Sequence, residues 1–168
     1  MEMKKIALFI GRFQPFHKGH LYVIKKVMKE FDEVVIGIGS VNKKDVYNPF
    51  SYEERKEMIR RVGIKSKIFG VEDVGDDEKW AQLVLKKAKF DVVITGSGWV
   101  KRCFKSIKKI INADLLNPEK YNGTKIREKI LKSKNWEDLV PTEIVKYMKE
   151  IDGEERIKRL MHEHLASR

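Results

Sequence analysis

The sequence predicts an α/β protein built on a doubly wound parallel sheet, with additional helices toward the carboxyl terminus. Short apolar runs alternate with amphipathic stretches of about ten residues, the pattern of strands joined by crossover helices. The strand-like runs are apolar throughout, as expected where both faces of a sheet are covered. Strands are predicted at 6–10, 33–39, 67–71, 90–95 and 109–113, the last in a segment that is also compatible with a helix end.

Helices are predicted between and after these strands by apolar residues at helical spacing and by capping signals. Ser51 and Glu54 form the pattern of a capping box, and the acidic segment 72–78 is expected to be a loop. The expected helices cover about 19–31, 51–62, 80–89, 125–134, 141–153 and 154–165. The first of them has an inner face made of Leu21, Ile24, Val27 and Met28.

Length and composition indicate one domain spanning residues 1–168, with a helical part at about 136–168. The net charge of +11 favours anionic partners, either nucleotides or nucleic acid. Cys103 is the only cysteine, which suits a reducing cytosol. No apolar run approaches the ~20 residues of a membrane helix, and the chain enters its first strand without room for a signal peptide. We therefore expect a cytoplasmic protein without a membrane partner.

The segment from Ile6 to His20 carries the strongest functional pattern, a buried strand followed at once by the start of a helix. Gly11 permits a tight turn at the end of the strand, and Arg12 places a fixed charge there. His17 and His20, three residues apart, fall on one face of the first helical turn. Two donors beside the positive end of a helix dipole predict an anion site, and a phosphate chain fits it best.

A second candidate site is the segment Asn122-Gly123-Thr124-Lys125-Ile126-Arg127. Gly123 allows close approach of a ligand to the backbone, Thr124 offers a hydroxyl, and the free N–H groups of the following helix attract anions. Arg127 lies one turn into the helix and has a fork of donors for phosphate. An ordinary helix cap with a surface arginine is the alternative.

Three further residues are candidates because of where they lie along the predicted elements. Ser40 follows the second strand, where the carboxyl end of a strand meets ligand in an open α/β sheet. Arg55 lies one turn into the capped helix, and a solvated surface charge is the alternative. Trp80 lies near the end of the third strand, where its ring offers a face to a cationic ring. A core tryptophan is the alternative there.

The run Gly11-Arg12-Phe13-Gln14-Pro15-Phe16-His17-Lys18-Gly19-His20 resembles the signature of archaeal-type nicotinamide mononucleotide (NMN) adenylyltransferases, within the nucleotidyltransferase superfamily that carries His-x-Gly-His. The resemblance implies a Rossmann-like fold and transfer of the adenylyl group of ATP to NMN, giving NAD and pyrophosphate. The catalytic residues that it implies are His17, His20, Arg12 and Arg127. The implied ATP-binding residues are Gly11, Arg12, Phe13, His17, His20, Asn122, Gly123, Thr124 and Arg127. The implied NMN-binding residues are Phe13, Ser40, Arg55 and Trp80.

The expected partners are ATP and NMN, with magnesium (Mg2+) held mainly by the triphosphate, and no protein metal site or nucleic acid is expected. The resemblance also implies a homo-oligomer. The chain departs from the family at Asn122, where serine is usual, and at Gly96-Ser97-Gly98, where the family has Gly-Asn-Pro. Two alternatives therefore stay open. One is adenylyl transfer to another phosphate ester such as FMN or phosphopantetheine, and the other is a basic RNA-binding module.

Overall fold

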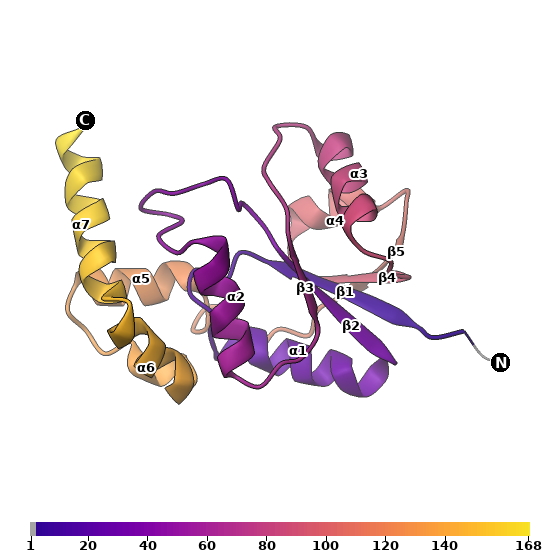
Figure 1. Cartoon of the computed structure of the whole chain (residues 1–168), viewed down its shortest axis with the longest axis horizontal. Helices are drawn as coiled ribbons and strands as arrows, with labels where there is room; N and C mark the ends of the chain where they lie inside the picture. Colours follow the sequence, from indigo (N-terminus) through magenta and orange to yellow (C-terminus); the bar gives the residue numbers. More distant parts are fainter. Residues whose placement is uncertain (1–2) are drawn as a thin grey trace. The chain divides into compact units, whose positions relative to one another are not determined.

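The computed structural model describes residues 3–168 and contains a five-stranded parallel sheet in the order β3-β2-β1-β4-β5 (Figure 1). The strands are β1 (Ile6–Gly11), β2 (Glu33–Ile38), β3 (Lys67–Gly70), β4 (Val92–Thr95) and β5 (Lys109–Asn112). The predicted doubly wound parallel sheet is therefore confirmed, including the fifth strand, for which the sequence left a helix end open.

The helices are α1 (Lys18–Glu30), α2 (Tyr52–Arg61), α3 (Asp77–Lys87), α4 (Gly98–Phe104), α5 (Gly123–Leu131), α6 (Thr142–Glu150) and α7 (Gly153–Ala166), with a 3₁₀ turn at Glu137–Leu139. None of the helices within residues 3–168 is long and apolar enough to cross a membrane.

The chain divides into two compact units, which are described separately. Of the described residues, the first unit contains 3–12, 22–42 and 65–115, and the second contains 13–21, 43–64 and 116–168. One boundary falls between Arg12 and Phe13, and another lies inside α1. That the chain forms a single domain stays a prediction.

The first unit holds the sheet, most of α1, and α3 and α4. Figure 1 shows α1 on one face of the sheet and α3 and α4 on the other. Alternate residues of β1 serve the two faces, and Leu8 and Ile10 join the core beneath α3 and α4 with Trp80 and Phe104. Because β1 pairs with both β2 and β4, the strand order reverses at β1, and ligands of doubly wound sheets bind at the carboxyl ends of such strands.

The second unit is helical, with α7 packed on α5 and α6, and α6 packed on α2. Two ion pairs connect these helices, one from Arg156 to Glu54 at 2.6 Å and one from Arg61 to Glu150 at 2.7 Å. The capping box predicted at Ser51 is confirmed, because Ser51 Oγ accepts from the N–H of Glu54 while the Glu54 carboxylate accepts from the N–H of Ser51.

The structure corrects four details of the sequence prediction. Helix α3 starts at Asp77 rather than Trp80, because Asp76 caps it and acidic residues favour the first turn of a helix. Helix α4 was not predicted, and α5 begins two residues early, at Gly123. Met28 is 46% exposed, and Val23 takes the buried position on α1.

Candidate active site

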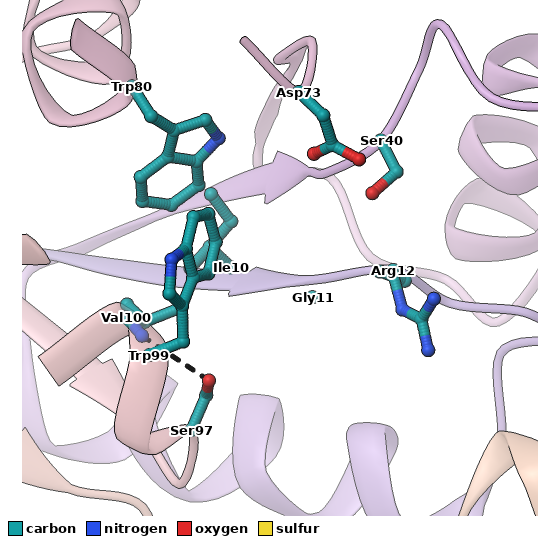
Figure 2. A pocket seen from close by; sticks show the side chains of 9 residues that line it. All are labelled: Ile10, Gly11, Arg12, Ser40, Asp73, Trp80, Ser97, Trp99 and Val100. Atoms are coloured by element: carbon teal, nitrogen blue, oxygen red, sulfur yellow. Dashed lines mark hydrogen bonds between the residues drawn. The ribbon is translucent and has the colours of Figure 1, made fainter. Parts of the chain in front are cut away.

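The first unit contains a pocket of about 470 Å³ at the carboxyl ends of its central strands. It is lined by Ile10, Gly11, Arg12, Ser40, Asp73, Trp80, Ser97, Trp99 and Val100 (Figure 2). Four residues predicted for the site, Gly11, Arg12, Ser40 and Trp80, are thus brought together from three separate stretches of the sequence. The pocket lies where the strand order reverses, as the fold class leads us to expect.

Ser40 is held at the rim of this pocket by a sharp turn at the end of β2. The N–H of Gly39 donates to the carbonyl of Gly11 at 2.9 Å, and the N–H of Val41 donates to the carbonyl of Val71. Between them Ser40 is buried and has a φ of 54°, in the left-handed region that costs a non-glycine residue free energy. The fold therefore maintains a strained backbone that turns the Ser40 hydroxyl toward the pocket (Figure 2).

Two tryptophans form one wall of the pocket, and the sequence identified one of them. The Trp80 and Trp99 rings lie with centroids 4.4 Å apart. Trp99 donates from Nε1 to Asp77 at 2.8 Å, and Arg102 binds the same carboxylate, so that these two hydrogen bonds lower the pKa of Asp77. Trp80 is 2% exposed and belongs to the core, yet it also lines the pocket. The two interpretations of Trp80 are therefore compatible.

Asp73 is a second pocket residue that the sequence analysis did not single out. Asn42 fixes its backbone from both sides, because Asn42 Nδ2 donates to the carbonyl of Asp73 and Asn42 Oδ1 accepts from its N–H. The Asp73 carboxylate points into the open part of the pocket (Figure 2). The signal available in the sequence was an aspartate three residues beyond the end of a strand, but the acidic run around it concealed that signal.

In the second unit, His17 and His20 cap the start of α1 together. The backbone N–H of His20 donates to Nδ1 of His17 at 3.3 Å, and the backbone N–H of His17 donates to Nδ1 of His20 at 3.1 Å. This is the reciprocal arrangement of a capping box, made here by two imidazoles whose rings stack with centroids 3.5 Å apart. The prediction that both rings share the first turn is therefore confirmed.

The cap also determines where each ring carries its proton. A nitrogen that accepts from a backbone N–H is unprotonated, so each neutral ring carries its proton on Nε2 and Nε2 is a donor. Burial lowers the pKa of His17 from 6.5 to about 4. Burial, and secondarily the charge on His17, also lower the pKa of His20. Both rings are therefore neutral hydrogen-bond donors at pH 7.

Gly19 is required by this cap. A Cβ atom at position 19 would lie 2.9 Å from Cε1 and Nδ1 of His17 and 3.1 Å from Cβ of Tyr121. Carbon atoms do not approach so closely, so only glycine lets the His17 ring fold back over the helix start. Glycine is therefore needed at position 19 of His-x-Gly-His because the ring of the first histidine, His17, packs against it.

The second predicted segment starts α5 in the same unit. Asn122 Oδ1 accepts from the N–H of Lys125 at 2.8 Å, so Asn122 is the N-cap. Arg127 is buried and donates to the carbonyl of Gln14 at 2.6 Å and to Thr124 Oγ1 at 3.4 Å. Gly123 permits this approach, because a Cβ there would lie 2.9 Å from the same Gln14 carbonyl. The close contact that Gly123 allows is thus with the chain itself.

These contacts bring the two segments expected to hold phosphate together within the second unit. Phe13 has a φ of 54°, and its ring lies 4.6 Å from that of His20. Arg55 is fully buried and donates from Nε to the carbonyl of Ser51 at 3.2 Å. Phe13 and Arg55 thus lie in the second unit, whereas Ser40 and Trp80 lie in the first. The ligand contacts of all these residues stay predictions.

Three features define a nucleotidyltransferase of the α/β class: the sheet order, the pocket where that order reverses, and the histidine-capped helix. The chain matches the cytidylyltransferase-like family over residues 8–147. The nicotinamide-nucleotide adenylyltransferase of Thermoplasma acidophilum is 41% identical over 165 residues, which cover 94% of this chain and 92% of that relative. The enzyme of the same name from Methanococcus maripaludis (strain C6) is 42% identical over 164 residues, covering 92% and 94%. The chain therefore belongs to the nicotinamide-nucleotide adenylyltransferase family within the cytidylyltransferase-like proteins.

A solved structure agrees with this assignment. A bifunctional NMN adenylyltransferase/ADP ribose pyrophosphatase from Francisella tularensis, complexed with AMP and a manganese ion, superposes with a TM-score of 0.79 at 26% identity. The match covers 98% of this chain and 54% of that protein, so the chain spans about half the length of the bifunctional protein.

Proposed function

We propose that the chain transfers the adenylyl group of ATP to NMN. An oxygen of the NMN 5′-phosphate attacks the α-phosphorus of ATP, the bond from that phosphorus to the α–β bridging oxygen breaks, and NAD and pyrophosphate result. The phosphate nucleophile has a second pKa of about 6 and is already ionised at pH 7, so no general base is required. The protein must align the two phosphates and stabilise the charge on the leaving pyrophosphate.

The observation that carries this proposal is the double-histidine cap. Because both Nδ1 atoms accept from the backbone, His17 and His20 are held as neutral Nε2–H donors with a fixed direction. Neutral donors stabilise charge that develops in the transition state without holding the pyrophosphate product as tightly as cations would. The relatives named for this activity support NMN as the acceptor.

The pocket of the first unit and the start of α5 in the second supply the other groups that bind the substrates. Arg12 supplies a permanent positive charge at the rim of the pocket for the phosphates. The N-terminus of α5, with Thr124 and Arg127, supplies further donors for ATP. The pocket of the first unit, with its tryptophan wall, takes the pyridinium ring of NMN, whose positive charge favours aromatic surfaces.

A divalent cation, which we take to be magnesium (Mg2+), completes the proposal. Residues 3–168 contain no group of three or more His, Cys, Asp or Glu side chains that could hold a metal ion. We therefore propose that the ion is held mainly by the triphosphate oxygens rather than by protein side chains. When bound, such an ion neutralises phosphate charge.

The acceptor is tested by measuring pyrophosphate release and identifying products with ATP and a panel of phosphate esters. We expect efficient NAD formation from NMN. Activity with FMN and phosphopantetheine should be poor, because neither the bulky flavin nor the pantetheine arm carries the positive charge that favours the tryptophan wall. FAD or dephospho-coenzyme A formation with negligible NAD would contradict the proposal. A homo-oligomer is also proposed, from the resemblance alone, and light scattering tests it. We further propose that the protein does not bind nucleic acid, which light scattering with added RNA tests, and that it is cytoplasmic, from its single cysteine.

A further inference from the structure

The buried side chain of Gln14 forms two hydrogen bonds with the backbone of one distant residue of the second unit, Phe50. Gln14 Oε1 accepts from the N–H of Phe50 at 2.9 Å, and Gln14 Nε2 donates to the carbonyl of Phe50 at 3.1 Å. This two-bond exchange is the one that facing residues of antiparallel strands make, formed here by a side chain, and we call it the Gln14 clamp. Gln14 is 3% exposed and Phe50 is fully buried, so the clamp is shielded from water.

The position of Phe50 is also fixed from the side opposite in sequence, by α7. Arg156 donates from Nη1 to the carbonyl of Pro49 at 3.3 Å and to the carboxylate of Glu54 at 2.6 Å. Pro49 precedes Phe50, and Glu54 belongs to the capping box of the helix that follows it. Arg156 Cζ also lies 5.8 Å from the centre of the Phe50 ring. Phe50 is therefore a fixed anchor, and the segment that the clamp positions is the one that contains Gln14.

The backbone carbonyl of Gln14 determines where the Arg127 guanidinium lies. Arg127 Nη1 donates to this carbonyl at 2.6 Å, and Arg127 Nη2 donates to Thr124 Oγ1 at 3.4 Å. Because the guanidinium is planar, hydrogen bonds at two of its nitrogens restrict its orientation. The clamped amide and this carbonyl belong to the same residue, so holding the Gln14 side chain on Phe50 also holds the oxygen that Arg127 binds.

We propose that Gln14 is a positioning residue for adenylyl transfer: its clamp on Phe50 keeps its own carbonyl in place and so aims the Arg127 guanidinium at the phosphates of ATP. This inference rests on the proposed function, in which Arg127 is a donor for ATP. Gln14 contacts no substrate and acts through Arg127. A small displacement is enough to impair the site, because misplacing a group that binds substrate by about 1 Å costs up to roughly 10²-fold.

The first test measures KM for ATP and for NMN in the whole chain carrying Gln14→Met, which keeps a side chain of similar size and removes both bonds of the clamp. We expect KM for ATP to rise roughly tenfold, because Arg127 leaves its position, and KM for NMN to change by less than about twofold. Gln82→Met is the matched control, since it makes the same change at an exposed position of α3 and should leave both constants unchanged.

A purely structural role of Gln14 predicts a different result, a lower melting temperature without a preference between the two substrates. Ile144→Val, a buried residue of α6, is the control for lost stability and should lower the melting temperature without changing the ratio of the two KM values. Gln14→Glu keeps the acceptor for the Phe50 N–H and loses the donor. Its KM for ATP should lie between those of the wild type and Gln14→Met, and it provides the comparison if Gln14→Met does not fold.

A double-mutant cycle tests whether Gln14 acts through Arg127. The dissociation constant of α,β-methylene-ATP, whose α–β bond is not cleaved, is measured for the wild type, Gln14→Met, Arg127→Met and the double variant. We expect the roughly tenfold effect of Gln14→Met to shrink to less than about twofold when the Arg127 guanidinium is absent. An effect of equal size in both backgrounds overturns the inference, because Gln14 then influences ATP by another route.

The outcomes separate this inference from the proposed function. An unchanged KM for ATP in Gln14→Met, or an equal rise in KM for both substrates, overturns the inference while adenylyl transfer to NMN stands. A wild-type protein that forms no NAD from ATP and NMN overturns the proposed function itself. The binding cycle with α,β-methylene-ATP needs no turnover, so it still shows whether Gln14 positions Arg127.

Discussion

At the scale of single residues, the histidine pair shows how one arrangement of atoms serves both folding and chemistry. Each Nδ1 satisfies a backbone N–H at the start of α1, where four such groups lack partners within the helix. The consequence is that each Nε2 is a donor pointing away from its own helix cap. A helix cap made by serine or aspartate would satisfy the same N–H groups and leave no such donor.

A substitution at His20 tests the donor role. His20→Ala removes the donor, and kcat should fall by roughly 10²- to 10³-fold, the range for loss of one donor to a developing charge. The loss of one cap bond should cost about 1 kcal/mol of stability. His20→Asn, which retains an acceptor and an N–H donor, should lose less activity than His20→Ala. The exposed His162, on α7, provides the control for general effects of losing an imidazole. Turnover of His20→Ala equal to that of the wild type would remove His20 from the mechanism.

The low pKa of His17 predicts that acid weakens the fold. Because burial lowers the folded-state pKa from 6.5 to about 4, the unfolded chain binds more protons between these values. The contribution of neutral His17 to stability is therefore complete above about pH 6.5 and is lost as the pH falls through 4, by up to about 3 kcal/mol. Denaturant unfolding at pH 7.5, 5.5 and 4 measures this. His17→Asn keeps a capping side chain that does not titrate, and its stability should fall less over the same range.

At the scale of elements, we expect that replacing Gly19 in α1 by alanine lowers stability, although alanine has the higher helix propensity. Alanine is the better helix former, but a Cβ at position 19 overlaps the His17 ring. Gly19→Ala should therefore lower stability by about 1–2 kcal/mol and reduce kcat, because His17 must leave its position. Gly98, near the start of α4, has open space around its missing Cβ, and Gly98→Ala should be neutral or stabilising by up to about 1 kcal/mol. Thermal melts of the two variants, compared with the wild type, measure these two changes in stability. A stabilised Gly19→Ala would contradict the packing argument.

The elements that the sequence predicts well are those specified by local patterns. The strands are continuous apolar runs, and α2 carries a capping box that is complete within four residues. Helix α4 escapes prediction because its seven residues are too few to establish a helical period. The start of α3 escapes because acidic residues suit both a solvated loop and the first turn of a helix. In that case the N-cap Asp76 was the usable signal.

At the scale of the whole molecule, the candidate site is predictable where it depends on one segment and unpredictable where it depends on several. The histidine pair and the start of α5 are continuous motifs, so the sequence identifies them. Asp73 and Trp99 reach the pocket because β3 and β4 end at the same edge of the sheet as β1. That convergence is a property of the fold. In the sequence, the acidic run around Asp73 conceals its place after a strand, and Trp99 resembles any core aromatic.

The division into two units predicts that the two substrates protect different parts of the chain. We propose that the pyridine ring of NMN binds the pocket of the first unit and that the phosphates of ATP bind the histidine cap and the start of α5 in the second. Hydrogen exchange should therefore slow around residues 71–80 with NMN alone, and around 17–21 and 123–127 with a non-hydrolysable ATP analogue alone. Helix α7 serves as an internal reference, because none of its residues belongs to either set. If NMN instead protects 123–127 and leaves 71–80 unchanged, the pyridine ring does not bind beside Trp80, and its placement in this pocket is wrong.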